Sequence, residues 1–414
     1  LVTTNQASYI VVMKKEVQLH QLIRALTPAE KKHIRINLSK FRPNEATKKL
    51  LMFDALNAQK KHTEGFIEKE YSSSGYNSNF LAADRLLLYD LVLEGLAGFH
   101  SKNNLEVQLS DGFQKVVLLF EKKLFEQALK QIDRTEKLAL KIESYGSLIN
   151  LYHYKRRILK ITNDIEGAIQ ALKQQNDFWQ AQQRLNQYVQ LHYESILLRI
   201  QLSKARSEAN LSALDTFMQN TLLLQLQDND GYNIQFQYWE TFCNYYFIID
   251  DKQQELNCNE ALIQLIDAYP HFKKNEPLNY LVFQTRILAI KRSLWPENFW
   301  DYLAEYRALN KGFSKQKIQA ESIIFIFSYN YELDFYINSK QWTQALVVFP
   351  SLKKGLKKYG DYIRDHLKVT CFYRMAYIYF FNSHYGDALD ALDVVLEDFS
   401  AELRPDVYSF ALIL

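Results

Sequence analysis

The clearest pattern of apolar and polar positions in the chain lies between Lys368 and Phe399. In its first half, apolar residues recur at i, i+3, i+4 and i+7, which is the spacing of one helix face. In its second half they recur at i, i+4, i+7 and i+11, and a polar stretch at 382–384 supplies turn chemistry between the halves. The stretch therefore predicts two antiparallel helices. The two stripes consist of Phe372, Met375, Ala376 and Tyr379, and of Ala388, Leu392, Val395 and Phe399.

An alanine-centred pattern recurs from residue 106 onward. An aromatic residue or isoleucine stands three positions before an alanine, and an apolar residue follows the alanine. The alanines are Ala128, Ala168, Ala345 and Ala388. The first two lie 40 residues apart and the last two lie 43 residues apart, which predicts a repeated helix pair of that length.

The pattern is weaker between Ala168 and Ala345, where 177 residues leave room for three more pairs. Breaks at Asp228–Gly231, Asn275–Pro277 and Trp295–Glu297 divide this region. The second helices of these pairs are expected near Leu211–Leu226, Asn257–Ala268 and Asn298–Leu309. About seven helix pairs result, and we expect roughly twelve to eighteen helices in the whole chain.

A small residue in each helix of a pair, with aromatic residues around it, resembles the tetratricopeptide (TPR) repeat. The resemblance is clearest at Tyr329 to Leu352 and at Lys368 to Phe399. The chain is also similar, more loosely, to bacterial helical-repeat proteins that carry a basic N-terminal domain. The resemblance implies an all-α fold in which residues 106–414 form a right-handed antiparallel solenoid of helix hairpins. The period of 40–43 residues exceeds the 34 of a standard TPR, so we expect longer helices. Arg156 departs from the pattern, because it occupies the small-residue position of its helix.

Residues 13–105 do not follow this repeat and predict a small helical domain of their own. Thr27-Pro28-Ala29-Glu30 combines an N-cap, a proline at the first helical position and a capping-box glutamate, and it starts a helix that extends to Phe41. Pro43 is expected to end this helix, since a proline disfavours helix in the residue before it. Further helices are expected at Ala46–Lys60 and Phe80–His100, with a loop before the second.

The first residues of the chain are set apart from this domain. Met13-Lys14-Lys15 resembles a natural start, so we expect residues 1–12 to be a non-native or disordered extension. They lack the basic region and long apolar core of a signal peptide. The most apolar run, Ile323–Ile337, contains Glu332 and Asp334 and is too short to span a bilayer. We therefore expect a cytoplasmic protein that does not insert into a membrane.

Composition favours long helices over strands. The chain of 414 residues contains only 12 glycines and 7 prolines, fewer than a turn-rich β protein needs. Its three cysteines form no Cys-x-x-Cys pair, which favours buried thiols in a reducing compartment.

No catalytic motif is visible. The chain lacks a glycine-rich phosphate loop, a His-Glu-x-x-His motif and a serine flanked by glycines. The nine histidines show no metal-ligand spacing. We therefore expect no enzyme activity, no cofactor and no metal, although catalytic residues that converge only in space would escape this search. The expected function is a scaffold or adaptor that binds a protein or peptide on the concave face of the solenoid.

The TPR resemblance implies which residues would contact that partner. In TPR proteins the groove is lined by first-helix residues on the face away from the small-residue contact. The corresponding residues fall in three sets: His153, Arg157 and Lys160; Asn330, Asp334 and Asn338; and Tyr373, Tyr377 and Phe381. The lysine and asparagine clamp of chaperone-binding TPRs is not reproduced, and Asp334 would repel the C-terminal carboxylate that such a clamp holds. A chaperone-cofactor role is therefore not expected.

Positive charge is concentrated near the start of the chain. Between Lys14 and Lys61 there are twelve Lys and Arg against four Asp and Glu, although the net charge of the whole chain is only +3. A solvated charged surface is one interpretation. The other is a nucleic-acid-associated regulator, since clustered cations bind phosphates without any motif. The candidate contacts for that alternative are Lys31, Lys32, Arg35, Lys48 and Lys49.

A last apolar stripe lies at the end of the sequence. Pro405 suits the first position of a helix, and Val407, Phe410, Ala411 and Leu414 follow at helical spacing. Solenoids usually finish with a helix whose outer face is polar. We therefore expect either that the natural protein continues beyond Leu414 or that another chain covers this end.

Overall fold

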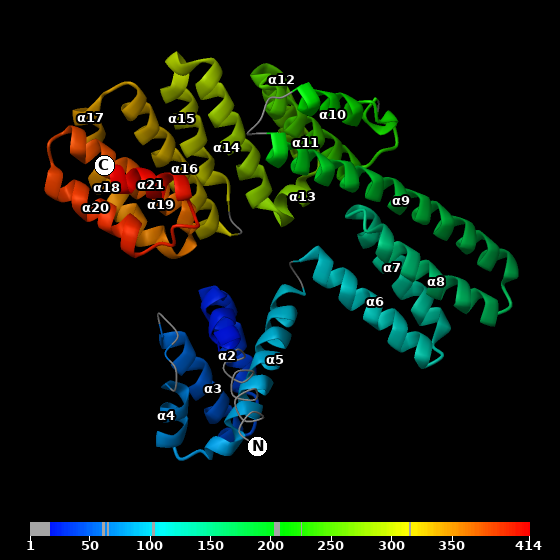
Figure 1. Ribbon diagram of the computed structural model, residues 1–414. Helices are drawn as coiled ribbons and strands as arrows, with labels where there is room; N and C mark the ends of the chain where they lie inside the picture. The colour runs from blue at the N-terminus through cyan, green and yellow to red at the C-terminus, as the bar shows by residue number, and fades with distance from the viewer. Residues whose placement is uncertain are drawn as a thin grey trace. The chain divides into compact units, whose positions relative to one another are not determined.

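The structure is a computed structural model, and it describes residues 17–59, 63, 66–101, 104–202, 208–224, 226–313 and 316–414. Within these residues lie twenty α-helices, α2 to α21, together with a helical segment at residues 17–25, and no strand (Figure 1). The prediction of an all-α fold is confirmed. The number of helices exceeds the expected range because several are short: α4 (Phe66–Ser73), α13 (Pro270–Asn275) and α17 (Trp342–Leu346).

The chain divides into two compact units, Leu1–Asn176 and Asp177–Leu414, and each is described by itself. The predicted extension at residues 1–12 lies outside the described residues. The predicted domain boundary near residue 105 stays a prediction.

The first unit begins with five helical segments around one apolar core. They are residues 17–25, α2 (Pro28–Leu38), α3 (Pro43–Ala58), α4 and α5 (Leu81–His100). The core side chains include Leu19, Ile23, Ile34, Phe53, Tyr71 and Leu88. The predicted capping box is present, since the Thr27 hydroxyl accepts from the Glu30 N–H and the Glu30 carboxylate accepts from the Thr27 N–H.

Two predictions about these helices are wrong. Pro43 is the first residue of α3. Proline is tolerated at this position because the N–H that it lacks would have no partner within the helix. As a result α2 ends at Leu38, short of Phe41, and α3 begins before Ala46. The helix α4 was not predicted. Its sequence carries only one short apolar pair, Ile67 and Tyr71, and both side chains are fully buried.

The rest of the first unit consists of helices in regular succession. They are α6 (Leu105–Glu121), α7 (Phe125–Lys141), α8 (Tyr145–Ile161) and the start of α9 (Ile165–Leu202). Helix α7 packs against both α6 and α8, and α6 also contacts α8. The Gln175 side chain of α9 donates to the Ile149 carbonyl of α8 at 2.9 Å. Three of these helices have 17 residues and are separated by three-residue turns. This is the sequential packing of hairpins that the apolar stripes predict.

The turns between these helices share one geometry. Lys123 adopts a φ of 59°, and its N–H donates to the Phe120 carbonyl at 3.0 Å. The N–H of Leu124 donates to the Leu119 carbonyl at 3.0 Å. These two bonds form a Schellman motif, which satisfies carbonyls at the end of a helix. The same turn recurs six times, with φ between 52° and 63° at Lys123, Glu143, Asn163, Asp250, Lys340 and Ser383.

The next helix starts immediately after each of these turns. The Leu124 carbonyl accepts the N–H of Ala128 at 2.9 Å, so one residue ends α6 and caps α7. The equivalent bonds are made by Ala168, Ala345 and Ala388. All four alanines are buried, which explains the alanine-centred pattern: a small side chain lets the second helix pack closely against the first directly after the turn. Ala171, about one turn further along α9, is also buried.

The second unit contains the remainder of α9 and twelve further α-helices. They are α10 (Glu208–Met218), α11 (Tyr232–Ile249), α12 (Lys252–Ala268), α13, α14 (Pro277–Leu294), α15 (Phe299–Ala308), α16 (Lys317–Asn338), α17, α18 (Phe349–Tyr359), α19 (Asp365–Phe381), α20 (Tyr385–Glu397) and α21 (Pro405–Ile413). Contacts join α11 with α12, α14 with α15, and α19 with α20, which are hairpins. Contacts also join α12 with α14, α14 with α16, and α16 with α19, so neighbouring hairpins stack.

The structure differs from the predicted hairpin period in two places. The helix α9 runs for 38 residues without a turn, because no glycine or proline follows Gly167 before it ends. The helix that carries Ala345 is split into α17 and α18. Pro350 explains the break, since its ring would clash with the carbonyl of Leu346, where α17 ends.

The last helix begins at Pro405 as predicted. Val407 and Ala411 are buried against α19 and α20, whereas Phe410 is exposed. The buried face of this helix is therefore narrower than the predicted apolar stripe, because it contains Val407 and Ala411 at the spacing i, i+4 but not Phe410. Whether anything covers this end stays a prediction.

The six left-handed turn residues provide a test of the hairpin geometry. Replacing Lys123 with glycine should stabilise the protein by about 0.5–1 kcal/mol, because glycine adopts positive φ without the clash that a Cβ causes. Lys137 is also an exposed lysine but lies within α7, so Lys137→Gly should destabilise by about 1 kcal/mol. Urea denaturation followed by circular dichroism measures both. A loss of stability in Lys123→Gly would show that this turn does not have the described geometry.

Candidate ligand-binding groove

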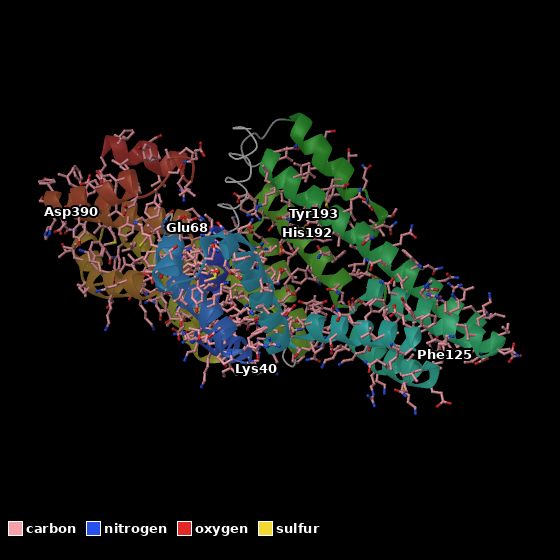
Figure 2. The ribbon with its side chains drawn as sticks, turned by 90° about the horizontal axis from the view of Figure 1, so that it is seen from below. Lys40, Glu68, Phe125, His192, Tyr193 and Asp390 are labelled. Carbon is pink, nitrogen blue, oxygen red and sulfur yellow. The ribbon has the colours of Figure 1, made fainter. Side chains whose placement is uncertain are left out.

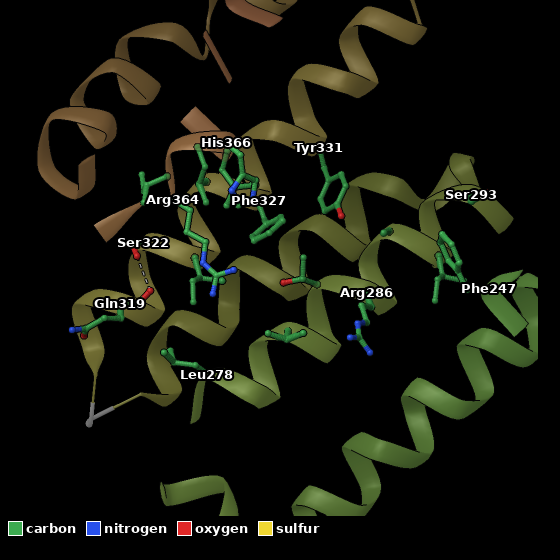
Figure 3. Close-up of a pocket in the computed structure, with 18 of the residues that line it drawn as sticks. Phe247, Leu278, Arg286, Ser293, Gln319, Ser322, Phe327, Tyr331, Arg364 and His366 are labelled. Carbon is green, nitrogen blue, oxygen red and sulfur yellow. Dashed lines mark hydrogen bonds between the residues drawn. The ribbon is translucent and has the colours of Figure 1, made fainter. Parts of the chain in front are cut away.

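The second unit contains a cavity of about 600 Å³, which we call the groove (Figure 3). Its middle is lined by α14 and α16. One end is lined by Arg199 of α9, Phe247 of α11 and the start of α12, and the other by residues 362–367 before and within α19. Its volume lies within the range of ligand sites in proteins, about 300–1,000 Å³.

The walls of the groove are mainly apolar. Helix α14 presents small or short side chains at Val282, Ala289 and Ser293, which leaves space, and α16 presents Ile323 and Phe327 opposite. Two of the hydroxyl groups in the walls already donate to main-chain carbonyls. Thr285 donates to the Leu281 carbonyl at 2.7 Å, and Ser322 donates to the Gln319 carbonyl at 2.7 Å. A ligand would therefore meet apolar surface along most of the groove.

Two of the cations that line the groove are neutralised by carboxylates. Arg286 donates to Glu240 at 2.6 Å. Lys252 lies 3.0 Å from Glu255 and 3.3 Å from Asp250. Burial alone would lower the pKa of Lys252, but the hydrogen bonds that it donates to Glu255 and Asp250, together with the charges of these carboxylates, raise the pKa above its ordinary value. Arg286 and Lys252 are therefore already paired with carboxylates of this chain.

Two other cations have no carboxylate partner among the described residues. Arg199 donates to the Asn244 side-chain oxygen at 3.1 Å, and its guanidinium lies 3.8 Å from the centre of the Phe247 ring. Burial, with the nearby charge of Arg286, lowers the pKa of Arg199 below its ordinary value. Arg364 is exposed at the start of α19. Beside it, burial and the charges of Arg364 and Arg404 lower the pKa of His366, so its ring is neutral at pH 7.

The helices around the groove are tied together by ion pairs between neighbouring hairpins. Asp334 of α16 contacts Arg292 of α14, and its second oxygen lies 3.1 Å from Arg374 of α19. Arg286 of α14 pairs with Glu240 of α11. Each arginine and its acid are 40–46 residues apart in sequence, which is about one hairpin. We call this series the arginine ladder.

Helix α9 is joined to α11 and to the residues before it by further polar contacts. Arg184 makes two bonds to Asp230, at 2.6 and 2.7 Å. Burial alone would raise the pKa of Asp230, but the bonds from Arg184 and from the Gln227 N–H hold it below its ordinary value. His192 contacts the Gln237 side chain at 2.5 Å, whereas its neighbour Tyr193 is exposed (Figure 2).

The residues that the TPR resemblance implied do not line the groove. Asn330 is buried, and its side-chain and main-chain oxygens accept from Arg374 at 3.2 and 2.8 Å. Asp334 belongs to the arginine ladder, and Asn338 is exposed. The structure thus brings Asn330 and Asp334 together between α16 and α19, where they hold helices rather than face an open site.

The aromatic set lies along α19. Tyr377 stands between Tyr373 and Phe381, with ring centres 6.3 and 4.8 Å away. Trp342 of α17 stacks on Phe381 at 4.7 Å. Phe381 is about half exposed, so this row covers the α17–α19 contact and also meets solvent.

The third set lies in the first unit, on the exposed face of α8. His153, Arg157 and Lys160 are all exposed there. The Arg157 guanidinium lies 4.5 Å from the centre of the Phe120 ring. Burial and the charges of Arg157 and Arg156 lower the pKa of His153.

Three of the five candidate nucleic-acid contacts have acidic partners. Arg35 pairs with Asp54 and Lys48 with Asp84. Lys49 is buried, lies 3.6 Å from the centre of the Phe41 ring and is 3.5 Å from Glu45. Charge that is neutralised in this way attracts phosphate less. Of the other two, Lys32 is exposed, whereas burial and the charge of Arg24 lower the pKa of the half-buried Lys31.

The groove-lining side of α16 differs from the predicted side by one position. The TPR resemblance implies Asn330, Asp334 and Asn338, whereas the groove is lined by Ile323, Phe327 and Tyr331. One residue rotates a helix by about 100°, which turns a contact face into a groove face. The signal that could have located the groove is the row of short side chains on α14, at Val282, Ala289 and Ser293.

No protein-family model, curated protein or solved structure matches this chain. The similarity to TPR repeats therefore stays a resemblance. No helix within the described residues is both long and apolar enough to span a membrane. In the same part of the chain, no group of three or more His, Cys, Asp or Glu side chains is placed to hold a metal ion.

The arginine ladder predicts a large effect for one neutral substitution. Asp334→Asn should destabilise the protein by about 2 kcal/mol, because it leaves Arg292 and Arg374 facing each other without a carboxylate. The exposed pair of Asp111 and Lys115 supplies the control, and Asp111→Asn should change stability by less than about 0.5 kcal/mol. Urea denaturation compares the two variants. Equal effects would mean that the ladder contributes no more than a surface ion pair.

Proposed function

We propose that this chain is a non-catalytic protein-interaction scaffold, and that the groove binds a segment of a partner protein. In this proposal the stacked hairpins form a TPR-like right-handed solenoid and the groove belongs to its concave face. The observation that carries the proposal is a groove of about 600 Å³ with apolar walls, built from helices of successive hairpins.

The chemistry of the lining residues favours binding over catalysis. The hydroxyls of Ser322 and Thr285 donate to main-chain carbonyls rather than to a base, so neither is activated as a nucleophile. Glu255, which lines the groove, is engaged with Lys252, and Glu240 is engaged with the lining residue Arg286. Apolar walls with a few polar groups suit a side-chain-bearing peptide, which gains binding energy from buried apolar area.

The alternative of a nucleic-acid-associated regulator is not favoured by a specific observation. The ion pairs of Arg35 and Lys48 reduce the charge available to phosphates. It stays a prediction for residues 14–61.

Filling the groove tests the proposed function. Random peptides displayed on phage should be enriched on the immobilised full chain, and synthetic versions should bind it. Ala289→Trp places a large side chain in the groove and should weaken binding of those peptides at least tenfold, because it removes the space that they occupy. Fluorescence anisotropy measures the affinities.

The control is Ala401→Trp, at an exposed position outside the groove, which should bind as the unmodified chain does. Circular dichroism of both variants shows whether they fold. The proposal fails if no peptide is enriched, or if folded Ala289→Trp binds the selected peptides unchanged.

A further inference from the structure

We propose that the groove recognises an acidic peptide segment with an apolar centre, in which carboxylates near both ends flank aliphatic or aromatic side chains. The inference rests on the proposed function and adds the chemical class of the partner. The charges that line the groove carry the argument, because its remaining surface is apolar.

The first charge is Arg199. Its partners among the described residues are one amide oxygen, on Asn244, and the face of the Phe247 ring. A guanidinium carries five N–H donors in a planar fork, so most of its hydrogen-bonding capacity remains for a ligand. Carboxylates match this fork with two parallel hydrogen bonds. The charges of Glu255 and Glu240 act on Arg199, but within the described residues neither forms an ion pair with it. A half-buried cation without such a pair provides a site for a carboxylate from outside.

The second charge is Arg364. It precedes α19, its side chain caps no helix, and no carboxylate of the described residues pairs with it. The adjacent His366 is neutral at pH 7, because burial and the charges of Arg364 and Arg404 lower its pKa. It adds a polar ring beside Arg364 without adding charge.

The two arginines belong to opposite ends of the groove. Arg199 and Phe247 come from α9 and α11, whereas Arg364 comes from the start of α19, with α14 and α16 between them. Figure 3 shows Phe247 and Arg364 on opposite sides of the cavity and Phe327 between them. A single phosphate would require donors that converge on one point. Separated arginines with an apolar wall between them fit two separate carboxylates instead.

The remaining charged groups do not cancel this pattern. Glu255 is the one carboxylate among the described lining residues, and it pairs with Lys252 at 3.0 Å. Arg286 is held by Glu240. The groove therefore keeps an excess of positive charge, which should disfavour a basic peptide.

Matched synthetic peptides test this inference on the full chain. The probe is a fluorescein-labelled peptide with the sequence Glu-Glu-Leu-Phe-Ala-Leu-Glu-Glu, and its partner has every glutamate replaced by glutamine. The acidic peptide should bind at least tenfold more tightly than the glutamine peptide. Added salt should lower the affinity of the acidic peptide more than that of the glutamine peptide. Arg364→Gln should reduce its affinity about five- to tenfold and leave the glutamine peptide unchanged. Fluorescence anisotropy measures each affinity.

Lys354→Gln is the matched control, because it removes an exposed positive charge from α18, outside the groove, and should not change binding. Arg199→Lys keeps the charge but loses the planar fork, so it should weaken binding of the acidic peptide and leave binding of the glutamine peptide unchanged.

If both peptides bind equally and Ala289→Trp still blocks their binding, the acidic preference is wrong and the proposed function stands. If neither peptide binds, the acidic preference is wrong and the phage-selected peptides decide the proposed function. If folded Ala289→Trp leaves the binding of every peptide unchanged, both proposals are wrong. If a long-chain dicarboxylic acid binds in the groove more tightly than the acidic peptide does, the site belongs to a small molecule and the proposal of a peptide ligand is wrong.

Discussion

The recurring turn with one left-handed residue is the constraint on which the stacked hairpins depend. It lets a single residue close one helix and cap the next, so the chain reverses within three residues and the carbonyls at the helix end stay bonded. Two helices joined so closely must pack against each other. The alanine that closes the first turn of the second helix makes this contact possible without a clash. Glycine is the usual residue at such turns, and lysine, glutamate, asparagine, aspartate and serine take its place here.

The arginine ladder acts at the next level, between hairpins. Apolar stripes bring neighbouring helices together but are tolerant of sliding, whereas a carboxylate between two guanidinium groups accepts only one register. Asp334 fixes α16 relative to both α14 and α19 in this way. Because each partner is half buried, the pairs are screened less by salt than surface pairs are. They hold in place the helices whose other faces form the groove.

The groove follows from short side chains on α14 opposite larger ones on α16. Val282, Ala289 and Ser293 of α14 do not fill the space in front of Ile323 and Phe327 of α16, and a cavity remains between them. Its chemistry separates it from the core. Buried charges in the ladder are paired, whereas Arg199 and Arg364 face the groove without a carboxylate of their own. Unpaired charge is costly in a core and useful in a binding site.

The sequence alone determined the helical class, the Thr27 capping box, the start at Pro405 and four alanines of the hairpins, because these depend on residues near each other along the chain. The sequence predicted the helix boundaries around Pro43 less well, because this proline is also the first residue of the next helix. The groove could not be predicted. Asn330 and Tyr331 are adjacent in sequence, yet one contacts α19 and the other lines the cavity. Only the packing of α16 against two neighbours determines which face stays open, because helical periodicity marks an apolar face without indicating what will cover it.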